Sequence, residues 1–473
     1  MEKYNHKRIA HWNEIADKLS KNWRGLGQYY NDRISEIYRF NIPDNQAVLE
    51  VGTGTGKLLS TLNPSRGLGI DISDGMVKLA KENHPELEFI QMDAVNFSIA
   101  ENFDFVVMSD TINDLYDVQA ALENISHVIK PDGRLVINFY NRLWELPLKI
   151  AEILNLAKPN LMQNWLTVDD AKNLLDLAGF EPIKVWEEVI IPFSIPLLTP
   201  FFNKFLVRFW PFNHLAITNF IVARPKTRFS TKQVNPSVSI IIPARNESGN
   251  IASIFSRIPS QFENPELIFV EGHSRDDTLE EIKKQIDAHP DMKSALYVQQ
   301  GKGKGDAVRL GFSRATGDIL MILDADLTMP PENLPRFYNA ITDGVGEFIN
   351  GVRLVYPMEK DAMRFFNLIG NKFFSVVFTF LLGQPVKDTL CGTKVLKKKH
   401  YEEIAANRSY FGDFDPFGDF DLLFGAAKLN LKIVDMPIRY AERVYGTTNI
   451  QRWRHGWLLL KMVAFAATRL KFI

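Results

Sequence analysis

The chain has 473 residues, of which 46% are hydrophobic and 23% charged, and its formal net charge is -1. This length exceeds what one hydrophobic core usually supports, so we expect two or three domains, and the composition excludes an intrinsically disordered chain. The near-zero charge gives no reason to expect a nucleic-acid partner.

The single cysteine, Cys391, excludes an internal disulfide and fits a reducing compartment, so we expect a cytoplasmic protein. The first residues lack the apolar core of a signal peptide. No stretch offers 18 uncharged apolar residues, and we therefore predict no membrane-spanning helix.

A glycine-rich turn is the first informative feature of the chain. Residues 8–40 are predicted to be helical and rich in aromatic side chains, and a short apolar strand at 48–51 then leads into Gly52-Thr-Gly-Thr-Gly56. Glycines at such a turn let a ligand approach the backbone closely, and the helix predicted from Leu58 offers free N–H groups. A second strand ends in Asp71, which is placed to accept hydrogen bonds from ribose hydroxyls.

Further strands at 88–92, 103–108 and 134–139 continue the alternation of strands and helices, which predicts a parallel, doubly wound α/β sheet. A helix capped by Thr167, with Asp170 three residues later, and a closing strand at 219–224 complete this region.

These segments closely resemble a class I S-adenosylmethionine-dependent methyltransferase across nearly all of residues 1–224. The resemblance rests on Glu50-x-Gly52-x-Gly54-x-Gly56, Asp71, Asp93-Ala94 and the Pro131-Asp-Gly133 turn. It implies that S-adenosylmethionine is the cofactor and that it is bound by Glu50, Gly52, Gly54, Gly56, Asp71, Asp93, Ala94 and Asp110. Within this set Gly52 and Gly54 would approach the amino-acid end of the cofactor, Asp71 the ribose, and Asp93 and Ala94 the adenine.

Three alternatives remain open for this region. A nicotinamide site is disfavoured because the turn lacks the last spacing of G-x-G-x-x-G. Asp110 is placed near methyl transfer by the resemblance, but a structural role at the end of its strand is equally compatible with the pattern. The whole domain could also be a non-catalytic module that only binds or docks.

Residues 225–236 are polar, carry a proline at each end and are predicted to be a linker to a second domain at 237–473. Apolar strands at 238–243, 267–270, 295–298 and 319–323 each end in a polar or glycine-rich loop. Such loops gather at one carboxyl edge of a sheet, where α/β proteins bind ligands. At this edge Asp324 and Asp326 suggest oxygen ligands for a hard divalent cation, with an acidic turn as the alternative.

The loops together resemble a family 2 glycosyltransferase with the GT-A fold, in the dolichol-phosphate mannosyltransferase-like branch. The resemblance implies a nucleotide-sugar site made by Pro243, Arg245, Glu247, Glu271, Lys304, Asp324, Asp326 and Arg443. Asp324 and Asp326 would hold Mg2+ or Mn2+ against the diphosphate, Arg353 would face a phosphate, and Arg443 would lie on a loop that closes over the site.

The chain departs from this pattern in three places. The usual acidic pair is Glu271-Gly272 here, the branch's third metal ligand is replaced by Thr328, and Thr448-Asn449 replaces a common Ser-Lys pair. His273 beside the first of these is more often a solvated loop histidine than a ligand.

Two carboxylates bear on the acceptor. Asp421 matches an acidic family residue and could act as a base toward a hydroxyl, or it could cap its helix. A lipid phosphate would need no base because it is already ionised. Asp388 matches a motif near the donor, and a structural role is equally compatible.

Three segments, 190–215, 365–383 and 452–473, combine apolar and aromatic residues with Lys and Arg. Each could lie in a membrane interface or pack internally. The prolines of the first exclude one long helix. The two resemblances together predict a bifunctional enzyme that transfers a sugar to a polyprenyl phosphate at the inner face of the membrane and also transfers methyl groups. Sugar transfer to a hydroxyl of a glycan or small molecule is the alternative.

Overall fold

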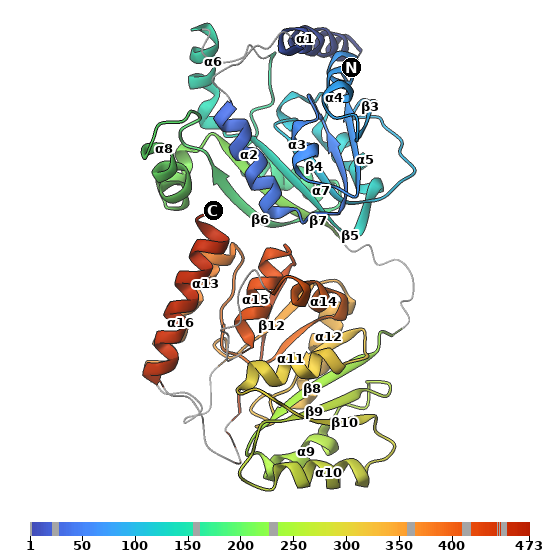
Figure 1. The fold of residues 1–473 in the computed structure, drawn as a ribbon, viewed down its shortest axis with the longest axis vertical. Coiled ribbons are helices and arrows are strands. Elements are labelled where there is room, and N and C mark those ends of the chain that lie inside the picture. The colour runs from blue at the N-terminus through green and yellow to red at the C-terminus, as the bar shows by residue number, and fades with distance from the viewer. Residues whose placement is uncertain are drawn as a thin grey trace. The chain divides into compact units, whose positions relative to one another are not determined.

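The computed structural model describes residues 2–20, 28–154, 161–226, 235–356, 365–408, 418–441, 443, 445 and 452–473. The chain forms two compact units, divided between Thr227 and Arg228. Each unit contains its own seven-stranded sheet with helices packed against it (Figure 1). Most of the predicted linker, the Thr448-Asn449 pair and the segment just before Gly418 lie outside the described residues.

The N-terminal sheet has the strand order β3-β2-β1-β4-β5-β7-β6. The pairs among β1 to β5 are parallel, as the alternation of strands and helices predicts. The last strand, β7, is antiparallel to both β5 and β6, so the prediction of a purely parallel sheet is wrong there. The strands are β1 Ala47–Val51, β2 Arg66–Asp71, β3 Glu88–Gln91, β4 Phe103–Ser109, β5 Ile129–Tyr140, β6 Phe180–Glu188 and β7 Thr218–Pro225.

Helices cover both faces of this sheet because successive strand side chains point to opposite sides. Val48 packs with residues of α2, α3 and α4, whereas Leu49 and Val51 pack with residues of α5 and α7. The helices are α1 Glu2–Ser20, α2 Gln28–Asn41, α3 Lys57–Thr61, α4 Asp74–Asn83, α5 Val118–Val128, α6 Glu145–Ile153, α7 Val168–Leu177 and α8 Leu198–Pro200.

The predicted cap of α7 is confirmed: Thr167 accepts a hydrogen bond from the Asp170 backbone, and the Asp170 carboxylate accepts one in return. Between β6 and β7 the chain forms only short helical turns, as its prolines predict. These turns are α8, η3 Phe201–Phe205, η4 Leu206–Arg208 and η5 Phe212–Leu215.

The C-terminal sheet has the order β10-β9-β8-β11-β13-β12-β14. The four predicted strands, β8 to β11, pair in parallel and so end at one edge. Strand β13 lies antiparallel between β11 and β12, and β12 pairs in parallel with β14. The strands are β8 Val238–Ala244, β9 Glu266–Glu271, β10 Ser294–Val298, β11 Ile319–Ile322, β12 Phe348–Val352, β13 Lys394–Lys397 and β14 Ile433–Pro437.

This sheet is also covered on both faces. Ile240 and Ile242 pack with residues of α9 and α12, and Ile241 packs with residues of α11 and α13 to α16. The helices are α9 Ser248–Arg257, α10 Thr278–Ala288, α11 Lys304–Arg314, α12 Leu334–Thr342, α13 Phe365–Leu382, α14 Lys398–Ala406, α15 Asp419–Lys428 and α16 Arg452–Ala466.

The apolar helices α13 and α16 lie side by side (Figure 1). Both take part in the core: Phe378 and Met462 are fully buried, while Val376 and Trp457 on the same two helices are exposed. Core packing therefore accounts for one side of each helix. Among the described helices, none is long and apolar enough to cross a bilayer.

Candidate active sites

The glycine turn after β1 has the conformation that its sequence requires. Gly52, Gly54 and Gly56 all have positive φ angles, of 77°, 52° and 73°. A Cβ atom on Gly52 would meet Thr111 Oγ1 at 2.4 Å, whereas a Cβ atom on Gly54 would have no neighbour within 4 Å. The backbone at Gly52 thus packs directly against Thr111, whereas the space beside Gly54 is empty and a ligand can reach the backbone there.

Glu50 lies beneath this turn and is buried. Its Oε2 accepts hydrogen bonds from Thr53 Oγ1 (2.8 Å) and from the backbone N of Leu59 (3.2 Å). Burial raises the pKa of Glu50 to about 8. The side chain therefore ties the turn to the start of α3 from inside the protein.

Asp71, at the end of β2, faces the same turn. Its carboxylate accepts hydrogen bonds from the backbone N of Gly54 and of Ser73, both at 2.9 Å. Burial raises its pKa. Each carboxylate oxygen keeps a second lone pair, so both backbone contacts are compatible with a further donor such as a ribose hydroxyl.

Helix α1 supplies polar partners to this edge that the sequence did not reveal. Asn5 donates to Asp93 Oδ2 (2.6 Å), and Asn13 Oδ1 accepts from Ser73 Oγ (2.5 Å). Trp12 Nε1 donates to Asp114 Oδ2 (2.7 Å). The aromatic residues of the first helical region were visible in the sequence, but these contacts join residues at least 60 positions apart, and no local pattern specifies them. Ala94, next to Asp93, is buried and gives its carbonyl to Asn124 (3.3 Å).

Asp110, at the end of β4, has a positive φ of 53° and is held by two neighbours. Tyr30 Oη lies 3.0 Å from both carboxylate oxygens, and Asn138 Nδ2 donates to Oδ1 at 2.6 Å. Burial, and then the Asp110 charge, raises the pKa of Tyr30 well above its ordinary value. The Tyr140 ring lies 6.4 Å from that of Tyr30 and 6.3 Å from that of Trp165. The carboxylate thus stands beside a group of aromatic rings.

In the C-terminal unit, Asp324 follows β11 and pairs with Lys304 at the start of α11, with 2.6 Å between Nζ and Oδ1. Burial raises the pKa of Asp324, but Lys304 and then Arg353 and Lys394 lower it, and the pKa ends below its ordinary value. The carboxylate is therefore ionised at neutral pH. A Cβ atom on Gly392 would lie 2.0 Å from Asp324 Oδ2 and 2.1 Å from Lys304 Nζ, so this pair fits only against glycine.

Asp326 pairs with Arg443, with 2.6 Å between Nη2 and Oδ2. Thr328, which replaces the branch's usual third ligand, donates its hydroxyl to Asp326 Oδ1 (2.8 Å). Arg443 also donates to Glu247 Oε1 (2.9 Å), so one guanidinium bridges two carboxylates from different loops. Burial, which Arg443 offsets only in part, raises the pKa of Glu247 to about 7.

The remaining predicted residues of the nucleotide pocket lie on the same loops. Glu271, buried at the end of β9, accepts from the backbone N of Ser274 (2.5 Å), and Pro243 is opposite Val270 in the neighbouring strand. Arg245 is exposed. His273, with a positive φ of 58°, lies in the same turn. The structure therefore brings together the predicted loops at one sheet edge.

Comparison with known proteins agrees with this geometry. Residues 42–179 match a family model described as a methyltransferase domain, and residues 239–405 match one described as glycosyl transferase family 2. The chain joins a methyltransferase domain to a family 2 glycosyltransferase domain.

Curated relatives match the glycosyltransferase domain. A dolichol-phosphate mannosyltransferase of Pyrococcus furiosus is 29% identical over 235 residues, which are 47% of this chain and 64% of the relative. An undecaprenyl-phosphate 4-deoxy-4-formamido-L-arabinose transferase of Klebsiella pneumoniae is 23% identical over 235 residues, 49% of this chain and 68% of the relative. The chain thus matches less than two thirds of the length of the Pyrococcus protein.

Among solved structures, a SAM-dependent methyltransferase of Thermotoga maritima is similar at 17% identity and a TM-score of 0.36, covering 46% of this chain and 100% of that one.

In the glycosyltransferase domain, Arg353 and Asp388 form a buried two-pronged ion pair. Arg353 Nε and Nη2 donate to the two carboxylate oxygens at 2.7 and 2.9 Å, and the Arg353 backbone N donates to Oδ2 at 3.2 Å. Burial raises the pKa of Asp388, but the opposing effect of Arg353 is larger, so the pKa lies below its ordinary value. Asp388 thus fixes the direction of the Arg353 side chain.

Asp421 is buried in the first turn of α15. Gly418 is the cap residue of this helix, so the interpretation of Asp421 as an N-cap is wrong. Its Oδ2 lies 3.0 Å from Arg408 Nε and 3.3 Å from Arg309 Nε. A Cβ atom on Gly418 would meet Gly305 Cα at 2.7 Å, which brings the start of α15 against the start of α11.

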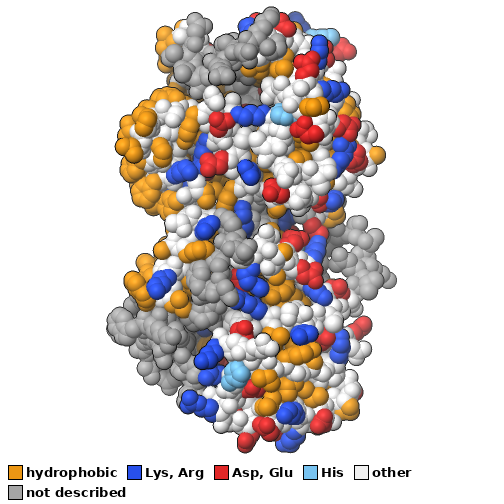
Figure 2. All heavy atoms as spheres, in the orientation of Figure 1, with side chains coloured by type: hydrophobic (Ala, Val, Ile, Leu, Met, Phe, Trp, Pro, Cys, Tyr) orange, Lys and Arg blue, Asp and Glu red, His pale blue; other side chains and the backbone are white. Residues whose placement is uncertain are grey.

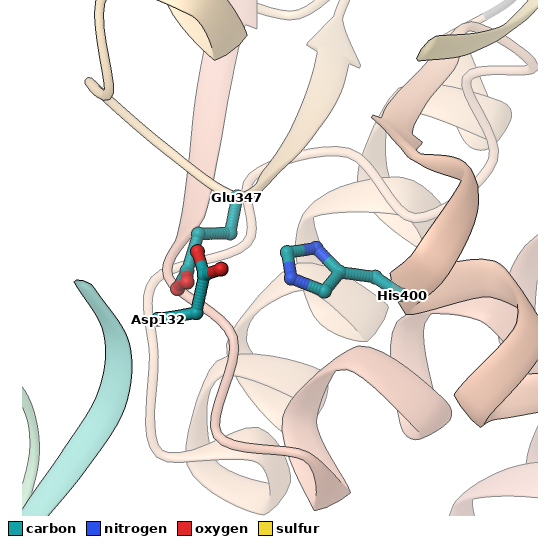
Figure 3. Close-up of side chains that lie close together, drawn as sticks. All are labelled: Asp132, Glu347 and His400. Carbon is teal, nitrogen blue, oxygen red and sulfur yellow. The ribbon is translucent and has the colours of Figure 1, made fainter. Parts of the chain in front are cut away.

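Glu347 and His400 of the same domain bring a carboxylate oxygen and a ring nitrogen within 4.8 Å of each other (Figure 3). Glu347 Oε2 accepts from the backbone N of Lys432 (2.9 Å). Asp132, drawn in the same view, belongs to the methyltransferase domain, where its carbonyl accepts from Arg134 (2.8 Å). Two ligand atoms do not define a metal site, so we assign no cation to this pair.

Proposed function

We propose that the chain is a bifunctional transferase that works in the cytoplasm at the inner face of a membrane. Its glycosyltransferase domain transfers a sugar from a nucleotide-sugar donor to a polyprenyl phosphate, and its methyltransferase domain uses S-adenosylmethionine. The observation that carries the first activity is the set of two ion pairs, Lys304 with Asp324 and Arg443 with Asp326, at the edge where the loops of β8, β9 and β11 meet.

The donor set fits a divalent cation. Asp324 and Asp326 offer carboxylate oxygens, which Mg2+ and Mn2+ prefer. A bound ion would offset the negative charge that develops on the departing diphosphate. Lys304 and Arg443, which neutralise these carboxylates in the structure, would then be available to the phosphate oxygens, and Arg353, directed by Asp388, would add a third cation.

The transfer is a direct displacement. An oxygen of the acceptor phosphate forms a bond to the anomeric carbon, the bond from that carbon to the diphosphate oxygen breaks, and its electron pair leaves with the nucleoside diphosphate. The configuration at the anomeric carbon inverts. No proton needs to be removed, because the acceptor phosphate is already ionised.

The surroundings of Asp421 support a phosphate acceptor. Arg309 and Arg408 both contact its carboxylate, and two guanidinium groups suit an anionic acceptor better than a neutral hydroxyl. The names of the Pyrococcus and Klebsiella relatives support the same class of acceptor. In this proposal Asp421 positions the two arginines.

The test of glycosyl transfer is the release of nucleoside diphosphate from a panel of nucleotide sugars, with polyprenyl phosphate and with or without Mn2+. Asp324→Asn and Asp326→Asn should each lower turnover at least about a hundredfold, because each removes an ionised ligand. Asp343→Asn, at an exposed carboxylate after α12, is the matched control. Unchanged turnover in both site variants would overturn the proposal.

Asp421→Asn separates the two acceptors. If a hydroxyl is the acceptor, this change removes the base and turnover is lost. If a phosphate is the acceptor, substantial turnover remains, and the loss appears mainly as a raised KM for the acceptor.

The methyltransferase activity rests on the open turn at Gly54 and on Asp71 beside it. Calorimetry should show S-adenosylmethionine binding, and Asp71→Asn should weaken it at least about tenfold, since a hydrogen bond to a charged group contributes about 1.5–3 kcal/mol. Asp44→Asn, on an exposed loop, is the control. Absence of binding at millimolar cofactor would overturn the proposed methyltransferase activity and leave a non-catalytic docking module as the alternative.

A further inference from the structure

The segment between β6 and β7 of the methyltransferase domain exposes an unusual amount of apolar surface. Nine of the 26 exposed large hydrophobic side chains among the described residues lie between Phe193 and Leu215. Leu197 is 88% exposed and Trp210 is 79% exposed. Figure 2 shows hydrophobic side chains gathered over this segment. Scattered exposed leucines are ordinary, but a contiguous group of this kind marks an interaction surface.

Two polar side chains of this segment, those of Thr199 and Asn203, point inward. Asn203 is fully buried, accepts from the backbone N of Ile190 (2.8 Å) and of Ile191 (2.9 Å), and donates to the Ile191 carbonyl (2.7 Å). Thr199, also buried, donates to the Phe193 carbonyl and accepts from the Ile195 N, both at 2.8 Å. These contacts satisfy backbone groups of residues 190–195 from inside the protein.

The exposed aromatic rings form an ordered ridge. Phe201 and Phe205 stack with ring centroids 5.8 Å apart, and Phe205 lies 5.0 Å from Phe209. Leu197 precedes the ridge on a turn with a positive φ of 66°, a conformation that a leucine rarely adopts. Phe472 stacks on the same ridge, with its ring centroid 5.5 Å from that of Phe205 and 6.0 Å from that of Phe209. The segment is therefore a built apolar surface in which ring contacts hold the exposed side chains in place.

Helix α6 extends this surface. Leu146, Ile150 and Ile153 are all exposed and are spaced to lie on one stripe of the helix. Trp144, just before α6, donates Nε1 to the Leu215 carbonyl (2.9 Å), which joins the start of the helix to the end of the segment.

The charge of the segment distinguishes between occupants. From residue 189 to residue 224 the sequence contains no Asp or Glu. Lys204 is half-exposed and His214 is exposed. Within residues 193–215 the charged side chains are therefore all basic, although Lys204 lies 3.8 Å from Glu36 and α6 carries Glu145 and Glu152 beside Lys149. A segment of Phe, Leu and Trp with basic residues and no acidic ones matches the interface of a bilayer, where rings insert among headgroups and anionic phosphates attract cations.

We propose that residues 193–215 and α6 form a membrane-contacting surface of the methyltransferase domain, with a phospholipid bilayer as its partner. This surface belongs to the methyltransferase domain and depends on none of the glycosyl-transfer chemistry described above. On a bilayer, this surface would place the methyl-transfer site close to acceptors carried by lipids, and soluble acceptors could still reach the site.

A single-site fluorescent label tests the proposal on the full chain. The natural thiol, Cys391, is buried and burial raises its pKa to about 11, so it reacts poorly with alkylating dyes. Leu197→Cys labelled with a nitrobenzoxadiazole dye is mixed with vesicles of phosphatidylcholine, alone or with about one fifth phosphatidylglycerol. Leu177→Cys, exposed on α7 of the same domain, carries the control label.

The dye at position 197 should shift to the blue and brighten at least about twofold on the vesicles, more strongly with phosphatidylglycerol, while the dye at 177 does not change. The triple variant Leu197→Ser, Phe201→Ser, Trp210→Ser should reduce vesicle co-sedimentation, with an unchanged circular dichroism spectrum showing that the chain still folds.

Three outcomes would overturn the proposal. The label at 197 could stay unchanged although the chain sediments with vesicles, which would place lipid contact elsewhere. It could already be blue-shifted without vesicles, which would show that protein covers the segment. It could shift only with rising protein concentration, which would identify a second copy of the chain as the occupant.

Discussion

Gly392 limits the space around the Asp324 carboxylate. A methyl group at this position would lie about 2 Å from both Asp324 Oδ2 and Lys304 Nζ, and it would force the two charged groups apart. We expect Gly392→Ala to lower glycosyl transfer at least about tenfold in a folded chain, because a misplacement of about 1 Å in a site can cost a hundredfold. Gly370→Ala, on α13 where a Cβ atom has no neighbour within 4 Å, is the control. Equal turnover in the two variants would contradict this reading.

Glu50 predicts a pH dependence of stability. Its pKa is about 8 in the native chain because of burial, against an ordinary value of 4.5. Between these values the native state holds a proton that the unfolded state releases, so the contribution to stability falls as the pH rises and is lost above about pH 8. Glu50→Gln keeps a neutral side chain at every pH. Its melting temperature relative to the natural chain should therefore increase from about pH 5 to about pH 9.

The control for this measurement is Glu123→Gln, at an exposed position of α5. A melting-temperature difference between Glu50→Gln and the natural chain that does not change with pH would show that Glu50 is already ionised in the folded protein.

The residues proposed to approach a ligand were easier to name from the sequence than the residues that hold them in place. Asp71, Asp324 and Asp326 could be named because each ends or closely follows an apolar strand, at the edge where α/β sheets usually bind ligands. The partner that links Asp326 to Glu247 is Arg443, which lies 117 positions from Asp326, and no local pattern states that contact. Whether each named residue contacts a ligand remains a prediction.

At the scale of elements, the cap of α7 can be tested locally. Thr167→Ala removes the side chain that accepts from the Asp170 backbone (3.1 Å). The loss of such a cap costs about 1 kcal/mol, which corresponds to roughly fivefold faster hydrogen exchange in the first turn of the helix. Asp169→Ala, in the same turn but largely exposed, should have little effect. Similar exchange rates in both variants would show that the capping box contributes nothing.

Strands bounded by clear turns were predictable because buried apolar runs have few other interpretations. The antiparallel strands were harder. β13, Lys394–Lys397, has lysine at both ends and is too short to show a period, yet it lies in the middle of the sheet. Its place is determined by pairing with β11 and β12, which are distant in sequence, and such pairing leaves no signal in four residues.

At the scale of the whole molecule, each unit has its own core and its own candidate ligand. A ligand that binds only folded protein raises stability by mass action, and it acts on the unit that binds it. We expect calorimetry of the full chain to show two unfolding transitions, one raised by S-adenosylmethionine and the other by a nucleotide sugar with Mn2+. A single transition raised equally by either ligand would show that the two units unfold together.

The two ion pairs of the proposed donor site also determine what this site attracts before any ligand arrives. The charges of Asp324 and Asp326 are cancelled by Lys304 and Arg443, and Glu247, with a pKa of about 7, adds at most one negative charge. A free nucleoside diphosphate therefore finds no net positive charge in these pairs, and a free divalent ion finds carboxylates that already have partners. In the proposed function, the metal complex of the nucleotide sugar would bring both signs together and replace each internal pair with an external one. We therefore expect the metal complex to be the form of the donor that binds, and each free component to bind weakly by itself.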